Sequence, residues 1–239
     1  GPNGDVTLPA PNGSALVALL RNAPPPPRQP AALTDFEQRH EARFKGRQFD
    51  WLDFQRDGQD YPAPSRIDPY VTPAQELWIR RDGAEQQLTR LGLRPQGVQW
   101  NRDATRLLFV ADSAYREERR YGASAVFTVA LDGTVRRLTP DRDYQHTGAA
   151  FSPDGKWVLY TKQLSTDAVI ARKLDHGGAT DLYVVPADGG AERNLTAEWD
   201  YLPGDAQWSP DGRRIIFRQQ QPRLFGAGRI RVLTFDDCE

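Results

Sequence analysis

Ser124 is the residue whose surroundings come nearest to a catalytic motif. It lies in Gly122-Ala123-Ser124-Ala125-Val126, which approaches the Gly-x-Ser-x-Gly nucleophile elbow. Val126 replaces the last glycine, and the residues that follow have the pattern of a strand, whereas an elbow leads into a helix. We therefore expect Ser124 to begin a strand, and we predict no catalytic residue in this chain.

The histidines and the cysteine do not form a metal-binding pattern. His40, His146 and His176 are far apart in the sequence, and none has ligand spacing to another histidine, cysteine or acidic pair. Cys238 is the only cysteine, so an intramolecular disulfide is impossible. Asp188-Gly189-Gly190 is interpreted as a hairpin turn and not as a phosphate-binding loop. We predict neither a metal nor a cofactor.

Two groups of charged and aromatic residues are candidates for binding. Arg116, Glu117 and Glu118 lie in a dense charged run, where the two carboxylates could attract an ammonium group. Neighbouring arginines would neutralise them, so a solvated loop is the alternative. Asp143-Tyr144 recurs as Asp200-Tyr201 and could line the mouth of a channel. The alternative is that each aspartate caps a turn and each tyrosine packs between sheets.

The elements that position these residues follow from an internal repeat. Phe151-Ser152-Pro153-Asp154-Gly155 recurs as Trp208-Ser209-Pro210-Asp211-Gly212, and each is followed by an apolar run. Looser copies lie at 100–104 and 11–13. Proline presets φ for the first turn position and glycine accepts a positive φ at its end. The structural turn residues of the two full copies are therefore Pro153, Asp154, Gly155, Pro210, Asp211 and Gly212.

A second hairpin motif alternates with the first. Its copies at 76–89, 126–139 and 181–196 each contain an apolar strand, an Asp-Gly turn and a closing Leu-Thr pair. Thr139 precedes Phe151 by the same interval as Thr196 precedes Trp208. Two hairpins per repeat give four strands, which is typical of propeller blades. A β-sandwich with common turn sequences is the alternative.

The predicted fold class is all-β: a partial β-propeller of about three and a half four-stranded antiparallel blades, with a short helical insertion. The predicted blades are 5–90 with an insertion at 22–75, 98–139, 149–196 and a partial blade at 206–235. In the insertion, Pro24–Pro27 forms a stiff spacer, and Thr34-Asp35-Phe36-Glu37 has the form of a capping box that begins a helix to about Phe44. The aromatic segment Phe49–Phe54 is expected to pack on the propeller.

Composition limits the possible partners. The chain has 239 residues and a net charge of −1, so no basic field draws it to nucleic acid, and no stretch is long and apolar enough to span a membrane. It contains no methionine and opens Gly1-Pro2-Asn3, from which we expect a fragment or a processed piece. The compartment stays open between bacterial periplasm and cytoplasm, with the periplasm favoured.

With these motifs, the chain resembles the WD40-like propellers of TolB and of the S9 (prolyl oligopeptidase) serine peptidases over roughly residues 10–220. The closest correspondences are Phe44-Lys45-Gly46 with Phe49-Asp50-Trp51, then Ala125–Thr139, and then Arg193–Thr196 with Trp199-Asp200 and Pro203-Gly204. The insertion at 22–75 favours S9 over TolB.

The resemblance implies a function, since S9 propellers cap an α/β-hydrolase domain that carries a Ser-Asp-His triad. That domain is absent here, so the chain is expected to gate and orient peptide substrates for a hydrolase domain of the same parent protein, a serine peptidase. Glu117 and Glu118 would then hold a substrate's amino terminus. The alternatives are a TolB-like protein-binding scaffold and a carbohydrate-binding propeller. An incomplete ring would also expose apolar blade faces, which we expect to carry Leu16, Val17, Leu19, Ile215 and Phe217.

Overall fold

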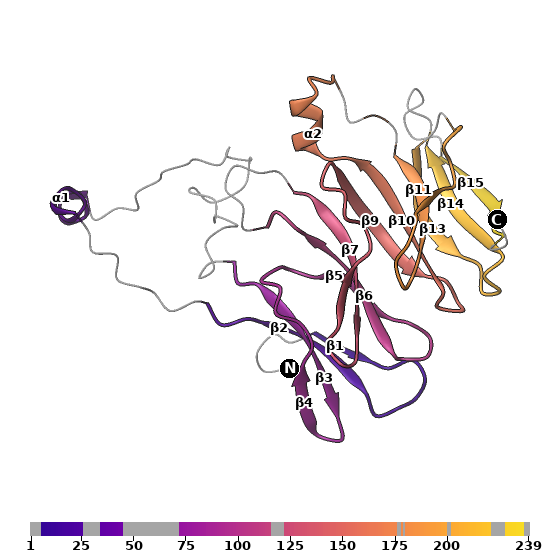
Figure 1. Ribbon diagram of the computed structural model, residues 1–239, viewed down its shortest axis with the longest axis horizontal. Helices are drawn as coiled ribbons and strands as arrows, with labels where there is room; N and C mark the ends of the chain where they lie inside the picture. The colour runs from indigo at the N-terminus through magenta and orange to yellow at the C-terminus, as the bar shows by residue number, and fades with distance from the viewer. Residues whose placement is uncertain are drawn as a thin grey trace.

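The computed structural model describes residues 6–25, 34–44, 72–115, 122–175, 178, 180–199, 202–220 and 228–236. Its strands form four antiparallel sheets, which we call blades 1 to 4 (Figure 1). Blade 1 contains β1 (Val6–Pro9), β2 (Val17–Asn22), β3 (Gln75–Arg81) and β4 (Ala84–Gln87). Blade 2 contains β5 (Gln96–Trp100), β6 (Arg106–Asp112), β7 (Ser124–Ala130) and β8 (Val135–Arg137). Blade 3 contains β9 (Tyr144–Phe151), β10 (Trp157–Leu164), β11 (Asp181–Pro186) and β12 (Arg193–Asn194). Blade 4 contains β13 (Leu202–Trp208), β14 (Arg214–Gln220) and β15 (Gly228–Thr234).

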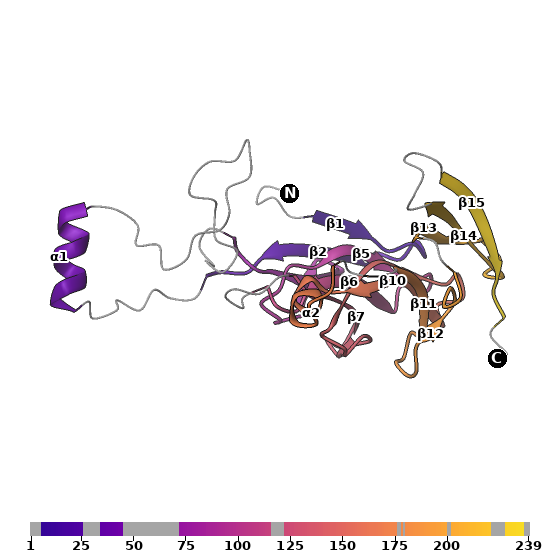
Figure 2. The same cartoon turned by 90° about the horizontal axis from the view of Figure 1, so that it is seen from above.

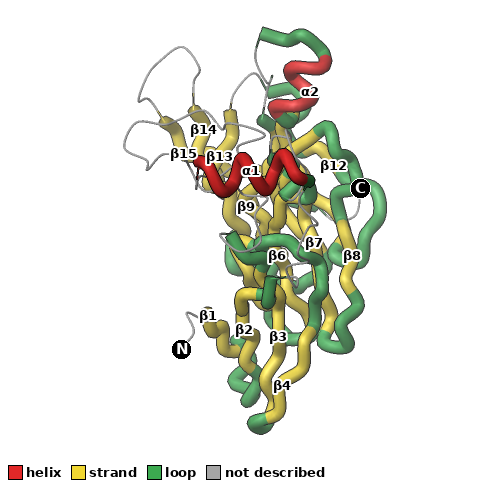
Figure 3. The backbone as a smooth tube through the Cα atoms, turned by 90° about the vertical axis from the view of Figure 1, so that its left-hand side faces the viewer, coloured by secondary structure: helices red, strands yellow, loops and turns green. Residues whose placement is uncertain are grey.

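Each blade is a simple up-and-down sheet, because every strand pairs with its neighbour in the sequence. The blades stack face to face through three apolar layers, one between each consecutive pair. Leu77 and Phe109 belong to the first layer, Val126 and Tyr160 to the second, and Leu182 and Phe217 to the third. Successive colours in Figure 1 follow this stack as a fan, and Figure 3 shows the same strands from the side on which α1 lies. The fold is a partial β-propeller, as predicted.

The Ser-Pro-Asp-Gly segments form tight turns between the first two strands of blades 3 and 4. The Gly155 amide donates to the Ser152 carbonyl at 2.9 Å, with Gly155 at a φ of +73°. The Ser152 hydroxyl donates to Asp154 at 2.6 Å and accepts from the Trp157 amide at 3.0 Å. Ser209 repeats this arrangement, and Asn101 replaces the serine in blade 2 by accepting from the amides of Thr105 and Arg106. The serine–aspartate pair therefore closes the hairpin from within.

In the part of the chain that the structure describes, two helices interrupt the strand pattern. The predicted helix is present as α1 (Asp35–Phe44), which lies apart from the sheets (Figures 1 and 2). The second helix, α2 (Thr166–Ala171), connects β10 to β11 and was missed by the sequence analysis, since six residues carry too little periodicity. Its N-cap is Ser165, whose hydroxyl accepts from the Ala168 amide. The predicted aromatic segment Phe49–Phe54 lies outside the described residues.

A bulge recurs in the first strand of blades 2, 3 and 4. The strand pairing shifts register between Gln96 and Gln99, between Leu159 and Thr161 on the partner strand, and between Gly204 and Gln207. The bulged residues are Gly97, Gly148 and Asp205, with φ values of +60°, +64° and +52°. Each lies three residues before the aromatic residue that ends the strand. The repeat thus includes a left-handed backbone position that glycine occupies twice.

The prediction that Leu19, Ile215 and Phe217 are exposed at the ends of the stack was wrong, whereas Leu16 and Val17 are half-buried. Leu19, Ile215 and Phe217 are 0%, 0% and 1% exposed. Side chains alternate between the two faces of a strand, and Ile215 and Phe217 point to the layer shared with blade 3. The outer face of blade 4 instead carries Ile216, Ile230 and Val232, which are 39%, 70% and 55% exposed.

The outer face of blade 1 is covered differently. The Arg21 guanidinium lies 5.6 Å from the centroid of the Trp78 ring and pairs with Glu85 at 2.6 Å. Arg80 pairs with the same carboxylate at 2.8 Å. The hydrogen bonds from Arg21, and then those from Arg80, lower the pKa of Glu85 to about 2. One end of the stack is thus covered by ion pairs, and the other end exposes aliphatic side chains.

Candidate functional site

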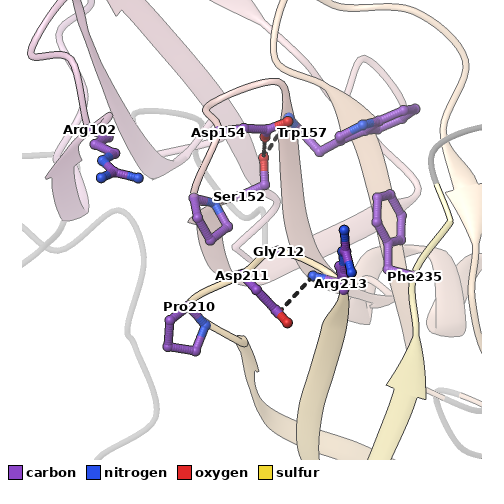
Figure 4. Close-up of a pocket in the computed structure, with 10 residues that line it drawn as sticks. Arg102, Ser152, Asp154, Trp157, Pro210, Asp211, Gly212, Arg213 and Phe235 are labelled. Carbon is purple, nitrogen blue, oxygen red and sulfur yellow. Dashed lines mark hydrogen bonds between the residues drawn. The ribbon is translucent and has the colours of Figure 1, made fainter.

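A cavity of about 440 Å³ opens between the turns of blades 3 and 4 (Figure 4). Its walls are the two Ser-Pro-Asp-Gly hairpins, one residue of the blade 2 turn and the residue that follows β15. The lining residues are Arg102, Ser152, Pro153, Asp154, Trp157, Pro210, Asp211, Gly212, Arg213 and Phe235. Of the six turn residues that were predicted as structural, all but Gly155 also line this cavity.

Aromatic rings form one wall of the cavity. The Phe235 ring lies edge-on to Trp157 and Trp208, with centroid distances of 5.6 and 4.8 Å. Phe235 is held there because its amide donates to the Arg213 carbonyl at 2.8 Å. Aromatic faces of this kind provide apolar contact area at low entropic cost.

Two carboxylates and two guanidiniums line the rest of the cavity. Hydrogen bonds from the Ser209 hydroxyl and the Arg213 amide lower the pKa of Asp211. Partial burial would raise the pKa of Asp154, but hydrogen bonds from the Ser152 hydroxyl and the Lys156 amide outweigh it, so the net shift is downward. Both acids are therefore charged at neutral pH, beside the permanently charged Arg102 and Arg213. The cavity offers complementary partners to a ligand that carries both an ammonium and a carboxylate.

The predicted binding residues Asp143 and Tyr144 lie at the other end of blade 3, beside α2. The Asp143 carboxylate pairs with Arg172, which follows α2, and its carbonyl accepts from the Ser165 amide at 2.8 Å. Tyr144 begins β9, and its ring centroid lies 4.3 Å from Lys162 Nζ. Asp143 thus fastens the helix that follows β10.

Lys162 is the centre of a half-buried polar cluster between blades 2 and 3. Its ammonium is only slightly exposed, pairs with the Glu192 carboxylate and lies 4.9 Å from the centroid of the Tyr183 ring. The Tyr160 hydroxyl donates to the other Glu192 oxygen at 2.6 Å. Burial raises the pKa of Tyr160, and the bond to Glu192 raises it further. Burial would raise the pKa of Glu192, but its bonds from Lys162 and Tyr160 give a net decrease.

Ser124 begins β7, as expected, and is not arranged as a nucleophile. Its hydroxyl donates to the His146 carbonyl at 2.7 Å and accepts from the His146 amide at 3.1 Å. The His146 ring is not bonded to this hydroxyl. Its Nδ1 is instead hydrogen-bonded to the Ser124 carbonyl at 2.8 Å. A carbonyl only accepts, so Nδ1 carries the proton, and Nε2 has no partner among the described residues.

The other predicted site residues cannot be compared with these groups. Arg116, Glu117, Glu118, Asp200 and Tyr201 lie outside the described residues. The sequence analysis missed Arg102, Trp157, Arg213 and Phe235, although the first three lie in or beside the recognised turns. It also missed Lys162 and Glu192, for which no local sequence signal exists, since they lie 30 residues apart.

Comparisons with known proteins concern the fold. No family model matches the sequence, and no curated protein matches it. Among solved structures, a putative TolB from Agrobacterium tumefaciens is 16% identical with a TM-score of 0.46, and the match covers 67% of this chain and 53% of that chain. A puromycin hydrolase is 20% identical with a TM-score of 0.43, covering 64% of this chain and 27% of that chain. A structure from a study of two prolyl endopeptidases is 12% identical with a TM-score of 0.44, covering 68% and 26%. The chain spans about half or less of the length of these proteins.

Proposed function

We propose that this chain is the non-catalytic propeller portion of an S9-type serine peptidase, which restricts and orients peptide substrates for an α/β-hydrolase domain of the same parent protein. The resemblance of the blade motifs and of the insertion to S9 propellers supports this proposal. The observation that carries it is the cavity between the turns of blades 3 and 4, which is lined by aromatic rings, two carboxylates and two guanidiniums. The exposed aliphatic outer face of blade 4 supports contact with a further part of the parent protein.

The repeat allows the outer face of blade 4 to be compared with the equivalent face of the other blades, residue by residue. Ile216, Ile230 and Val232 occupy the register positions that Leu159, Leu182 and Val184 occupy in blade 3. Those three residues of blade 3 are fully buried against blade 4. The same positions are buried in blade 1, where they are Ala18, Leu77 and Ile79. Aliphatic residues at exposed positions of this kind indicate that blade 4 receives a further layer of protein.

The cavity between the turns of blades 3 and 4 is the proposed peptide-binding site. Trp157 and Phe235 would contact apolar side chains of a peptide. Asp154 and Asp211 would attract its ammonium group, and Arg102 and Arg213 its carboxylate, through charge-assisted hydrogen bonds. A volume of about 440 Å³ accommodates a few peptide residues but no folded protein, so the cavity would restrict the size of the substrate.

Calorimetric titration with a short peptide tests this site. The probe is Lys-Ala-Phe-Pro-Ala with free termini, compared with the same peptide acetylated and amidated. We expect Arg213→Ala to weaken binding of the free peptide at least about tenfold, because one hydrogen bond to a charged group contributes about 1.5–3 kcal/mol. Arg81→Ala, an exposed arginine on blade 1, is the matched control and should change nothing. Absence of saturable binding, or equal affinity in the two variants, would refute the site.

A TolB-like protein-binding scaffold is the second candidate, and the exposed aliphatic face of blade 4 favours it equally. A fluorophosphonate probe distinguishes the two candidates. Residues 1–239 should stay unlabelled in either case, because the Ser124 hydroxyl is bonded to the His146 backbone. Labelling of the parent protein supports the peptidase, and its failure supports the scaffold. Stoichiometric labelling of Ser124 would contradict both.

A further inference from the structure

The turn of blade 2 differs from the equivalent turns at two positions beside the cavity. Arg102 stands where blades 3 and 4 have Pro153 and Pro210. Ala104 stands where those blades have glycine, yet it keeps the left-handed backbone, with a φ of +54°. Its amide donates to the Asn101 carbonyl at 3.0 Å, so the turn keeps the shape of the others. Blade 2 thus lacks the two residue types that favour this turn, and it carries an arginine that lines the cavity.

The left-handed conformation of Ala104 is strained, because it brings Cβ close to a carbonyl oxygen. Gly155 and Gly212 adopt φ values of +73° and +70° at the same position without this penalty. Strained residues that are not glycine are concentrated at functional sites. Among these three turns, the turn of blade 2 is therefore the one for which a function besides folding is expected.

The three turns lie against one another, which brings Arg102 to a cavity between two other blades. A Cβ added at Gly155 would lie 3.8 Å from Nδ2 of Asn101 in the blade 2 turn. A Cβ added at Gly212 would lie 3.5 Å from Cδ of Pro153 in the blade 3 turn. Arg102 therefore reaches the cavity past the blade 3 turn, and Figure 4 shows it on the side away from Phe235.

The two guanidiniums are the charged groups of the cavity that the hairpins do not use. Asp154 and Asp211 each accept from the serine hydroxyl of their own hairpin, at 2.6 and 2.5 Å. Asp154 also pairs with Lys156 at 3.7 Å. Within the part of the chain that the structure describes, the side chains of Arg102 and Arg213 form no hydrogen bond and no ion pair. The unused donors of the cavity thus exceed its unused acceptors in strength and number.

We propose that the cavity binds the C-terminal carboxylate of a short peptide, with Arg102 and Arg213 as the donors and the aromatic wall as the contact for apolar side chains near that end. This inference rests on the proposed peptide-binding function and specifies which end of the peptide is bound. Hydrogen bonds from guanidinium to carboxylate are roughly twice as strong as those between neutral groups. The ammonium end gains less, because Asp154 and Asp211 already accept bonds within their hairpins.

The chemistry of this ligand defines a class of substrate. A terminal carboxylate occurs once in a chain, and a cavity of about 440 Å³ admits it only on a short or unfolded peptide. New C termini arise when an internal peptide bond is hydrolysed, as the hydroxyl of water adds to the carbonyl carbon and its proton goes to the leaving amine. The substrates of the parent protein are therefore peptides that an earlier endoproteolytic step has released.

Calorimetric titration of the full chain with peptides capped at one end tests the inference. Acetylated Lys-Ala-Phe-Pro-Ala keeps the terminal carboxylate, and the amidated peptide with a free amino terminus keeps the ammonium. We expect the acetylated peptide to bind at least about tenfold more tightly, as for a hydrogen bond to a charged group. A third peptide, acetylated and amidated Lys-Ala-Phe-Pro-Glu, offers a carboxylate only in a side chain and should bind more weakly than the first.

Two variants matched to the repeat complete the test. Arg102→Pro gives the blade 2 turn the proline of blades 3 and 4, so it should fold. It should weaken binding of the acetylated peptide at least about tenfold and leave binding of the amidated peptide unchanged. Ala104→Gly is the control in the same turn, which relieves the left-handed strain and should leave both affinities unchanged. Circular dichroism confirms that both variants fold.

The outcomes separate this inference from the proposed function on which it rests. Equal affinity for the two singly capped peptides, or undiminished affinity in Arg102→Pro, overturns C-terminal recognition and leaves the peptide-binding site standing. Binding of the glutamate peptide as tightly as the acetylated one also overturns it, since any carboxylate then suffices. Absence of saturable binding for every peptide overturns both the inference and the proposed site.

Discussion

Replacing Thr139 by valine removes the side-chain hydrogen bond that joins the Leu-Thr pair after β8 to β7, with almost no change of shape. The Thr139 hydroxyl accepts from the Val126 amide at 2.9 Å, and both residues are 0–1% exposed. Without the hydroxyl, a buried amide loses its partner, which costs about 1–3 kcal/mol. Thr139→Val should therefore destabilise the chain by about 2 kcal/mol in urea unfolding, and the Val126 amide should exchange its hydrogen faster.

The corresponding threonines after β4, β8 and β12, which accept from the amides of the third strands, should not contribute equally to the free energy of unfolding. The Thr89 hydroxyl also donates at 2.5 Å to Glu76, a carboxylate that is 4% exposed. Hydrogen bonds to charged groups contribute about 1.5–3 kcal/mol, so Thr89→Val should cost more than Thr139→Val. Thr7→Val, on exposed β1, is the control and should change stability by less than about 0.5 kcal/mol. The reasoning is refuted if Thr139→Val matches this control, or if it costs more than Thr89→Val.

Three further predictions concern pH, the bulges and the cavity wall. Burial lowers the pKa of His146 more than its bond to the Ser124 carbonyl raises it, with Lys162 and Arg137 adding to the decrease and Glu192 opposing it. The unfolded chain therefore binds a proton that the folded chain resists, so stability should fall as the pH drops below about 6.5, and His146→Phe should reduce this slope in urea titrations. Gly148→Ala should destabilise by about 1–2 kcal/mol through its positive φ alone, because no atom lies within 4 Å of the added Cβ, whereas Asp205→Gly at the equivalent bulge should not destabilise. Phe235→Ala should raise the solvent exposure of Trp157 and Trp208, visible as a red shift of tryptophan emission, while Phe36→Ala on exposed α1 should leave the emission unchanged.

The blades could be predicted from the sequence because their determinants are local. Proline, aspartate and glycine fix the turns, and each turn is flanked by apolar runs of strand length. The capping box at Thr34 likewise predicted α1. The strand bulges at Gly97 and Gly148 were missed, since a single glycine in a strand is a weak signal until a register is known. Asp205 carried no signal of this kind at all.

The side chains that face each other across a layer could not be predicted in the same way. Exposure of Ile216 and burial of Ile215 depend on which face of β14 meets blade 3, and the apolar run there includes both residues. The cavity depends on the stacking of two hairpins and on the return of Phe235 beside Trp157. Lys162 and Glu192 meet only because β10 and the β11–β12 turn lie in the same blade. These contacts depend on tertiary packing, which the spacing of residues in the sequence does not predict.

Light scattering on the purified chain most directly tests the central claim, that the exposed aliphatic outer face of blade 4 is a surface that another layer of protein covers. The account predicts that the mass rises above the 26.9 kDa of one chain as concentration increases from about 1 to 100 µM, by mass action on an exposed apolar face. The triple variant Ile216→Ser, Ile230→Ser and Val232→Ser should stay a monomer and keep its fold. A wild-type chain that is monomeric throughout this range would contradict the account.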